Sequence, residues 1–351
     1  MEWLPMDPIL LLIIFSILIV IAFDFTNGMH DASNMIATLV ASRAMTPVQS
    51  LLLVGGFTFL GPILGGTAVA DTIGGFVDLG SLKALDSVTL VSCGMLAAIA
   101  WNLLTWRVGL PSSSSHALVG GLIGAVLMGA SASDISWGLV ELGQGRLVGV
   151  SKILLTLLTS PLIGFIAGFV LHKLMRFMLR AAKPSANQTL RRAQWVTAAA
   201  LAFAHGTNDA QKGMGIITLM LVLGGMLGEF AVPFWVIVVS ATSITVGTLL
   251  GGWRIVRTVG FGIYKLGPLH GFDAQLASST VIFGASLFGG PVSTTHVVST
   301  AIMGVGASEH PRAVRWSKAE EILIAWVATI PCTALFGVAI YGLFTLVRPL
   351  I

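Results

Sequence analysis

Charged side chains are scarce in this sequence. Asp, Glu, Lys and Arg make up only 10% of its 351 residues, whereas 55% are hydrophobic. Because a soluble globular protein carries about 25% charged residues, this composition excludes an ordinary soluble domain. Apolar runs of about 20 residues recur along the chain, and this is the length that a helix needs to cross a bilayer. The sequence therefore predicts an all-α, multi-pass protein of the cell (inner) membrane.

Cysteine is also rare, since the chain has only Cys93 and Cys332, and both fall in apolar runs. Two buried thiols predict neither a disulfide framework nor a metal site. The sequence lacks the Gly-x-Ser-x-Gly and His-Glu-x-x-His motifs of hydrolases and the Walker sequence of ATPases. A membrane-embedded hydrolase is therefore the less favoured reading, and no cofactor is expected. The net charge of +4 is explained by basic loops rather than by nucleic-acid binding.

Ten apolar segments can be assigned. They cover residues 9–41, 47–69, 88–106, 111–130, 153–171, 195–227, 232–250, 274–288, 291–306 and 322–347. The first is longer than one crossing requires and has Gly28 in its middle, so we expect a broken helix there. Asp24 lies in the same run and is assigned no role.

Lys and Arg are concentrated after the odd-numbered segments, at Arg43, Arg107, the basic stretch 173–194, Arg254, Arg257, Arg312 and Arg315. Because basic loops stay in the cytoplasm, these loops are predicted to be cytoplasmic and both termini external. Five crossings in the first half would make the second half run in the opposite direction.

Two polar motifs lie inside apolar segments. The first is Asn-Gly-Met-His-Asp-Ala-Ser-Asn at 27–34, and the second is His-Gly-Thr-Asn-Asp-Ala-Gln-Lys at 205–212. Polar and ionisable groups at bilayer depth are unfavourable there and mark ion or substrate paths. Helical spacing places the polar residues of each motif on one face. The candidate ligands of a coupling cation are Asn27, Asp31, Asn34, Asn208 and Asp209.

Carboxylate and amide oxygens suit a hard cation such as Na⁺, and a carboxylate can also carry a proton. A structural polar network that ties helices together is the alternative. Two roles are open to Lys212, which could neutralise Asp209 or attract an anion. Substrate contacts or network roles are also open to His30, His205 and Gln211.

Two hydroxyl-rich motifs share a second design, Pro-Ser-Ser-Ser-Ser-His at 111–116 and Pro-Val-Ser-Thr-Thr-His at 291–296. Proline suits the first turn of a helix, and a helix N-terminus inside a protein is an anion site. The alternative is that the hydroxyls only cap helix ends. The candidate anion ligands are Ser112, Ser113, Ser114, Ser115, Ser293, Thr294 and Thr295, and His116 and His296 could either bind substrate or cap neighbouring helices.

The two pairs of motifs recur in the same order and at nearly the same spacing. Two copies in opposite orientation form an inverted-topology repeat, a common architecture of secondary transporters with broken helices at the midplane. We therefore expect a first repeat at 1–172, a basic cytoplasmic linker at 173–194 and a second repeat at 195–351, with helical hairpins in each repeat.

The polar motifs resemble the paired signature Gly-Ala-Asn-Asp-x-x-Asn of the PiT inorganic phosphate transporter family. Gly28, Asp31 and Asn34 match, although Met29 and His30 replace Ala and Asn, and the second copy ends in Ala-Gln-Lys as in bacterial members. The resemblance implies a homodimeric symporter that imports inorganic phosphate with Na⁺ or H⁺, or as a metal–phosphate complex. The hydroxyls would then be the phosphate ligands. A sulfate permease of the same family is the alternative.

Overall fold

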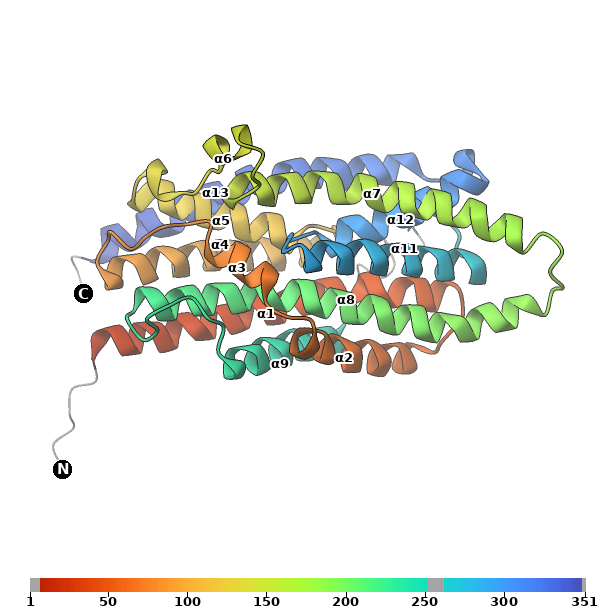
Figure 1. Cartoon of the computed structure of the whole chain (residues 1–351), viewed down its shortest axis with the longest axis horizontal. Coiled ribbons are helices and arrows are strands. Elements are labelled where there is room, and N and C mark those ends of the chain that lie inside the picture. The colour runs from red at the N-terminus through yellow and green to blue at the C-terminus, as the bar shows by residue number, and fades with distance from the viewer. Residues whose placement is uncertain (1–6, 252–259, 261, 349–351) are drawn as a thin grey trace, which may run out of the picture.

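A computed structural model describes residues 7–251, 260 and 262–348, so Arg254 and Arg257 lie outside the described residues. Its helices run roughly along one axis (Figure 1). They are α1 (Pro8–Ala41), α2 (Pro47–Leu64), α3 (Ala68–Gly74), α4 (Ala84–Val108), α5 (Ser114–Gly129), α6 (Leu139–Gly143), α7 (Gly149–Met178), α8 (Ala186–Leu223), α9 (Phe234–Leu250), α11 (Pro268–Leu287), α12 (Thr294–Glu309) and α13 (Trp316–Val347), with short 3₁₀ turns at Ala132–Asp134 and Pro311–Ala313.

Five of the described helices are long and apolar enough to cross a membrane: α1, α2, α4, α7 and the Ala319–Val347 part of α13. Their outward faces carry large apolar side chains, and Leu158 and Val327 are each 72% exposed. Such side chains are stable in contact with lipid and not with water. The predicted class, an all-α multi-pass membrane protein, is confirmed.

The helix that carries the first polar motif is unbroken. α1 continues from Pro8 to Ala41, so the interruption expected at Gly28 is not present. A Cβ atom at Gly28 would lie 2.0 Å from the backbone oxygen of Ile244 in α9. The glycine therefore permits close helix packing, while the helix keeps its own hydrogen bonds. An interruption occurs instead in the second segment, where α2 ends before Gly66, whose φ is +80°.

The third and fourth segments form a hairpin rather than two separate crossings. α4 and α5 extend inward from one end of the bundle, and α11 and α12 extend inward from the other, so their turns meet near the middle (Figure 1). Ser112 to Ser115 and Val292 to Thr295 are nearly fully buried. The connection that follows α4 therefore lies inside the protein and is not the surface loop expected after the third segment. Its hydroxyl groups find buried partners there, such as Trp101 and Thr329 for Ser112.

The basic stretch is largely helical. α7 continues to Met178 and α8 begins at Ala186, so residues 179–185 alone connect them. This connection and the end of α1 lie at one end of the bundle, whereas α1 begins and α13 ends at the opposite end (Figure 1).

Helices from the two halves of the chain pack against each other in matching pairs. Gly206 of α8 lies against the backbone oxygen of Thr58 in α2, as Gly28 of α1 lies against α9. Gly124 of α5 approaches α13, and Gly304 of α12 approaches α7. Each half thus supplies glycines that let a helix of the other half approach closely.

Candidate substrate and cation site

The turns of the two hairpins contact each other in the middle of the bundle. The hydroxyl of Ser115 donates to the backbone oxygen of Val292 at 2.9 Å, and the rings of His116 and His296 lie 4.9 Å apart. Both helix N-termini with hydroxyl-rich sequences, one at α5 and one at α12, therefore point into the same buried region. Because the positive ends of two helix dipoles meet there, the region favours an anion.

The serines at the start of α5 have different partners. The Ser113 side chain accepts from the backbone N–H of His116 at 3.2 Å, so Ser113 is the N-cap of the helix. Ser112 accepts from the indole of Trp101 at 2.7 Å and lies 3.2 Å from the Thr329 hydroxyl. Only Ser114 reaches the first polar motif, donating to the Asn27 side chain at 2.6 Å.

The start of α12 repeats this arrangement. Ser293 accepts from the backbone N–H of His296 at 3.3 Å and caps the helix. The hydroxyl of Thr294 lies 3.0 Å from an oxygen of Asp31 and 3.2 Å from one of Asp209. Thr294 therefore links the aspartates of the two polar motifs, which belong to different helices.

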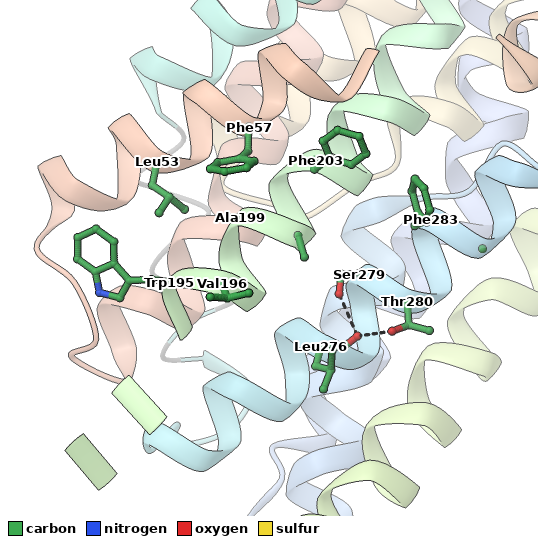
Figure 2. Close-up of a pocket in the computed structure, with 12 residues that line it drawn as sticks. Leu53, Phe57, Trp195, Val196, Ala199, Phe203, Leu276, Ser279, Thr280 and Phe283 are labelled. Atoms are coloured by element: carbon green, nitrogen blue, oxygen red, sulfur yellow. Dashed lines mark hydrogen bonds between the residues drawn. The ribbon is translucent and has the colours of Figure 1, made fainter. Parts of the chain in front are cut away.

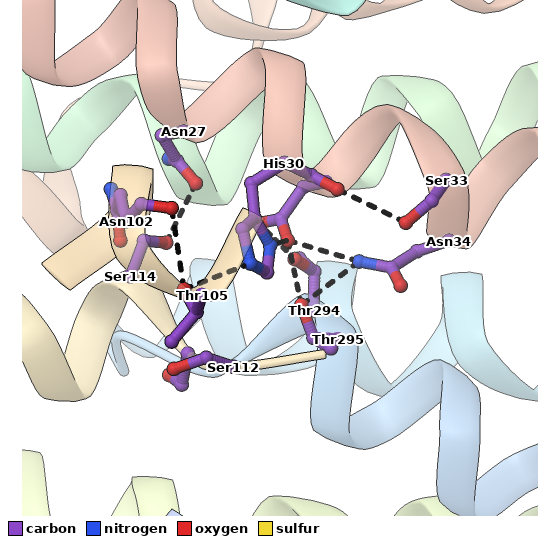
Figure 3. A network of polar contacts seen from close by, with 12 residues as sticks. Asn27, His30, Ser33, Asn34, Asn102, Thr105, Ser112, Ser114, Thr294 and Thr295 are labelled. Atoms are coloured by element: carbon purple, nitrogen blue, oxygen red, sulfur yellow. Dashed lines mark hydrogen bonds and ion pairs between the residues drawn. The ribbon is translucent and has the colours of Figure 1, made fainter. Parts of the chain in front are cut away.

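Asp31 connects Asn34, Thr294 and Thr295, which belong to the polar network drawn in Figure 3. It accepts from the hydroxyl of Thr295 at 2.6 Å and from the Asn34 amide at 3.0 Å. His30 lies 3.6 Å from the same carboxylate, and its other ring nitrogen lies 3.3 Å from the Thr105 hydroxyl. The side-chain oxygen of Asn34 is buried without a hydrogen-bond partner among the described residues.

The amide side chains of the second motif form hydrogen bonds with neighbouring helices and turns. Asn208 donates to Ser286 and to the backbone oxygen of Gly290, and accepts from the N–H of Val292, so it fixes the turn between α11 and α12. The side-chain oxygen of Gln211 accepts from the N–H groups of Val69 and Ala70. Asn208 and Gln211 are therefore positioned to support the site's framework.

The charged residues of the second motif form a buried cluster. The ammonium of Lys212 lies 2.7 Å from Asp209, and both side chains are fully buried. His205 lies 3.3 Å from Asp209. One ligand atom from each of Asp31, His205 and Asp209 lies within 4.8 Å of the others. The cluster thus brings together residues that are far apart in the sequence.

A family model described as the phosphate transporter family matches residues 27–337 of this chain. The chain belongs to the phosphate transporter family. A probable low-affinity inorganic phosphate transporter of Bacillus subtilis (strain 168) is 39% identical over 345 residues, covering 97% of this chain and 100% of the relative. A protein of Rhizobium meliloti (strain 1021) with the same description is 42% identical over 328 residues, covering 93% and 94%.

A solved structure of "the sodium-dependent phosphate transporter" has the same fold, with a TM-score of 0.85 at 23% identity, covering 96% of this chain and 99% of that one. The relatives in this family are transporters. The protein is therefore a transporter and not an enzyme, which rules out the hydrolase alternative.

A large groove on this phosphate transporter family member lies apart from the polar motifs. It has a volume of 980 Å³ and is lined mainly by apolar side chains of α2, α8 and α11, such as Phe57, Val196 and Phe283 (Figure 2). Its two hydroxyls, on Ser279 and Thr280, both donate to the backbone oxygen of Leu276. Because its lining is mainly apolar and includes no charged residue, the groove is not a candidate phosphate site.

Sequence reasoning gave no role to Asp24, an acidic residue of the transporter's interior, and did not select the buried Asp273. Asp24 is fully buried and precedes Asn27 by one helical turn on α1. A pattern was available, because residues 24, 27 and 31 recur at helical spacing and so share a face with the first motif.

Proposed function

We propose that this protein is a secondary transporter that imports inorganic phosphate together with a cation, Na⁺ or H⁺. The observation that carries the proposal is the meeting of two inward-pointing helix N-termini with the aspartates of α1 and α8. Donors that suit an anion lie here in contact with carboxylates that suit a cation. Each bound ion would therefore have an ion of opposite charge beside it. A phosphate and a cation bound side by side would therefore bind cooperatively, as symport requires.

Four hydroxyls are proposed to contact phosphate: Ser114, Ser115, Thr294 and Thr295. The capping serines are not included, because the side-chain oxygen of each accepts from the N–H group three residues later, which directs the side chain to its own helix. The first N–H groups of a helix lack acceptors within the helix. The N–H groups that begin α5 and α12 are therefore proposed as further phosphate donors. Ser112 acts through its bond to Trp101 as a support of the turn.

The two motifs differ in the charge of the side chain that donates to their aspartate. Three residues after each Asp, the first motif has Asn34 and the second has Lys212, and each donates to its Asp, at 3.0 Å and 2.7 Å. The amide leaves the charge of Asp31 uncompensated by that bond, whereas the ammonium neutralises Asp209. We therefore propose Asp31, with Asn34 and Asn27 nearby, as the place where a mobile cation would be held. The earlier alternative, that Lys212 mainly attracts the anion, is less favoured.

Helices of one half pack in matching pairs against helices of the other half. This packing supports the expected inverted repeat, with residues 1–172 and 195–351 as the repeats. Such repeats allow one half to rock against the other around a central site. We also propose that the protein is a homodimer, as the family resemblance implies.

Transport assays can test the proposal directly. Purified protein in proteoliposomes should accumulate labelled phosphate when Na⁺ and pH gradients are imposed one at a time, and one of the two gradients should drive it. Labelled sulfate distinguishes the alternative substrate. Accumulation of sulfate in preference to phosphate would favour the permease, and the absence of any counterflow of either anion would refute the proposed function.

A further inference from the structure

Asp24 is the buried carboxylate that the transport site leaves without a partner. Its side chain has no exposed surface, and neither of its oxygens accepts a hydrogen bond from the described residues. By contrast, Asp31, Asp209 and Asp273 each accept at least one such bond. Burying an ionised carboxylate without a partner is strongly unfavourable. The neutral, protonated form of Asp24 is therefore the one that this environment favours.

The surroundings of Asp24 place it beside the charged cluster of the second motif. A Cβ atom at Gly213 of α8 would lie 2.2 Å from a carboxylate oxygen of Asp24. The side chain thus packs directly on the α8 backbone, one residue from Lys212. Of the groups that face it, the Ser240 hydroxyl of α9 and the Lys212 ammonium favour a negative charge on Asp24, whereas Asp209 disfavours one. Its own helix supplies His30 and Asp31 about two turns further on.

We propose that Asp24 binds the proton that this transporter moves together with phosphate. With the proton bound, the side chain is a neutral carboxylic acid suited to its dry position. When the proton leaves, the carboxylate that remains has the ammonium of Lys212 nearby, and Lys212 can divide its interaction between Asp24 and Asp209. The inference rests on the proposed function and names a proton as its coupling cation. Asp24 lies two helical turns before Asp31 on α1, so the two carboxylates would form one proton path, with Asp24 as the buried binding site and Asp31 beside the phosphate.

The pairing of Lys212 with Asp209 supports this assignment. The ammonium already supplies a positive charge on the α8 side of the site, where the first motif has the neutral Asn34. A metal cation at that position would be repelled. A proton on Asp24 can instead bind and leave without displacing Lys212.

The test uses the full chain in proteoliposomes loaded with labelled phosphate or surrounded by it. Asp24→Glu and Asp24→Gln have side chains of equal size, and only the first can carry a proton. With an acid-outside pH gradient, the wild type and Asp24→Glu should concentrate phosphate, whereas Asp24→Gln should reach only the external concentration. Phosphate counterflow without a gradient should persist in Asp24→Gln. Asp78→Asn, which changes an exposed carboxylate, is the matched control and should behave as the wild type.

Three outcomes contradict the assignment alone, and a fourth contradicts it together with the proposed function. Equal pH-driven accumulation by Asp24→Gln and Asp24→Glu would show that no ionisable group is needed there. Equal loss of accumulation and counterflow in both variants, with the melting temperatures of the wild type, would show that transport depends on the size of the side chain and not on its proton. Accumulation by the wild type that follows a Na⁺ gradient and ignores the pH gradient would leave phosphate transport standing and overturn Asp24 as its proton site. Absence of all counterflow in the wild type would refute the proposed function, and the Asp24 assignment with it.

Discussion

We expect the protein to lose stability when either charge of the Lys212–Asp209 pair is removed without the other. Both are fully buried, with 2.7 Å between ammonium and carboxylate. Removing one member of a buried ion pair leaves an uncompensated charge, which costs about 3–5 kcal/mol. We expect Asp209→Asn to lower the unfolding free energy by about this amount, measured by denaturation of the purified protein in detergent. The double variant Asp209→Asn/Lys212→Met should recover most of the loss.

Asp31→Asn is the matched control for this prediction. Asp31 accepts from Thr295 and Asn34, and an asparagine oxygen can keep accepting from one or both. Its loss of stability should therefore be smaller, while its gradient-driven uptake is abolished. Equal destabilisation by Asp31→Asn and Asp209→Asn, without recovery in the double variant, would argue against the ion pair as the source of the effect.

The residue types in the sequence were enough to predict many residues of the candidate site. They were not enough to predict where each side chain points. Asp31, Asp209 and Thr295 could be selected from the sequence because polar residues in apolar segments are rare. The sequence could not separate Ser113, which caps its own helix, from Ser114, which contacts α1. Neighbouring residues of one type have the same propensities, and only the path of the backbone through the turn decides which hydroxyl points to which partner.

At the scale of elements, the two N-capping serines should separate stability from binding. Ser113→Ala and Ser293→Ala each remove a cap, and this typically costs about 0.5–2 kcal/mol. We expect both variants to melt at lower temperature and to keep the wild-type phosphate affinity, as measured by calorimetry.

Ser114→Ala and Thr295→Ala provide the contrast. Each should weaken phosphate binding about ten- to a hundred-fold, because a hydrogen bond to a charged group contributes roughly 1.5–3 kcal/mol. Their double variant should show coupling, since the two hydroxyls would share one ligand. If the capping variants lost affinity as strongly as these two, the division between caps and phosphate ligands would be wrong.

The packing of α2 against α8 makes a second prediction about elements. A Cβ atom at Gly61 would lie 2.4 Å from the backbone oxygen of Phe203, whereas nothing lies within 4 Å of one at Gly56 on the same helix. Gly61→Ala should destabilise the protein by about 1–3 kcal/mol through overpacking. Gly56→Ala should be neutral or stabilising by up to about 1 kcal/mol, since alanine favours a helix. Melting curves of the two variants measure the difference, and equal effects would contradict the close contact.

Apolar length predicted which segments are helical but not how deeply each penetrates. α4 and α5 have the composition of membrane helices, yet their connection at Ser112 and Ser113 is buried. Hydropathy measures the affinity of a segment for an apolar setting, and the interior of a bundle is also apolar. A hairpin inside the protein and a pair of crossings therefore give the same pattern.

For the whole molecule, the distribution of basic residues makes a prediction about orientation. The connection 179–185 between α7 and α8 and the connection between α5 and α6 lie at opposite ends of the bundle (Figure 1). Lys and Arg gather near the first, so it is predicted to face the cytoplasm. In this orientation the hairpin of α4 and α5 would enter from outside and the hairpin of α11 and α12 from the cytoplasm.

Cysteine labelling can decide the orientation. Cys93 is buried and Cys332 is half-buried, so both would first be replaced by alanine to remove background. Ser185 and Ser133 are exposed at the two ends, which makes Ser185→Cys and Ser133→Cys a matched pair. In intact cells, a membrane-impermeant maleimide should label Ser133→Cys at once and label Ser185→Cys only after permeabilisation. The reverse pattern would invert the molecule in the membrane, because the two positions belong to one rigid bundle and must exchange sides together.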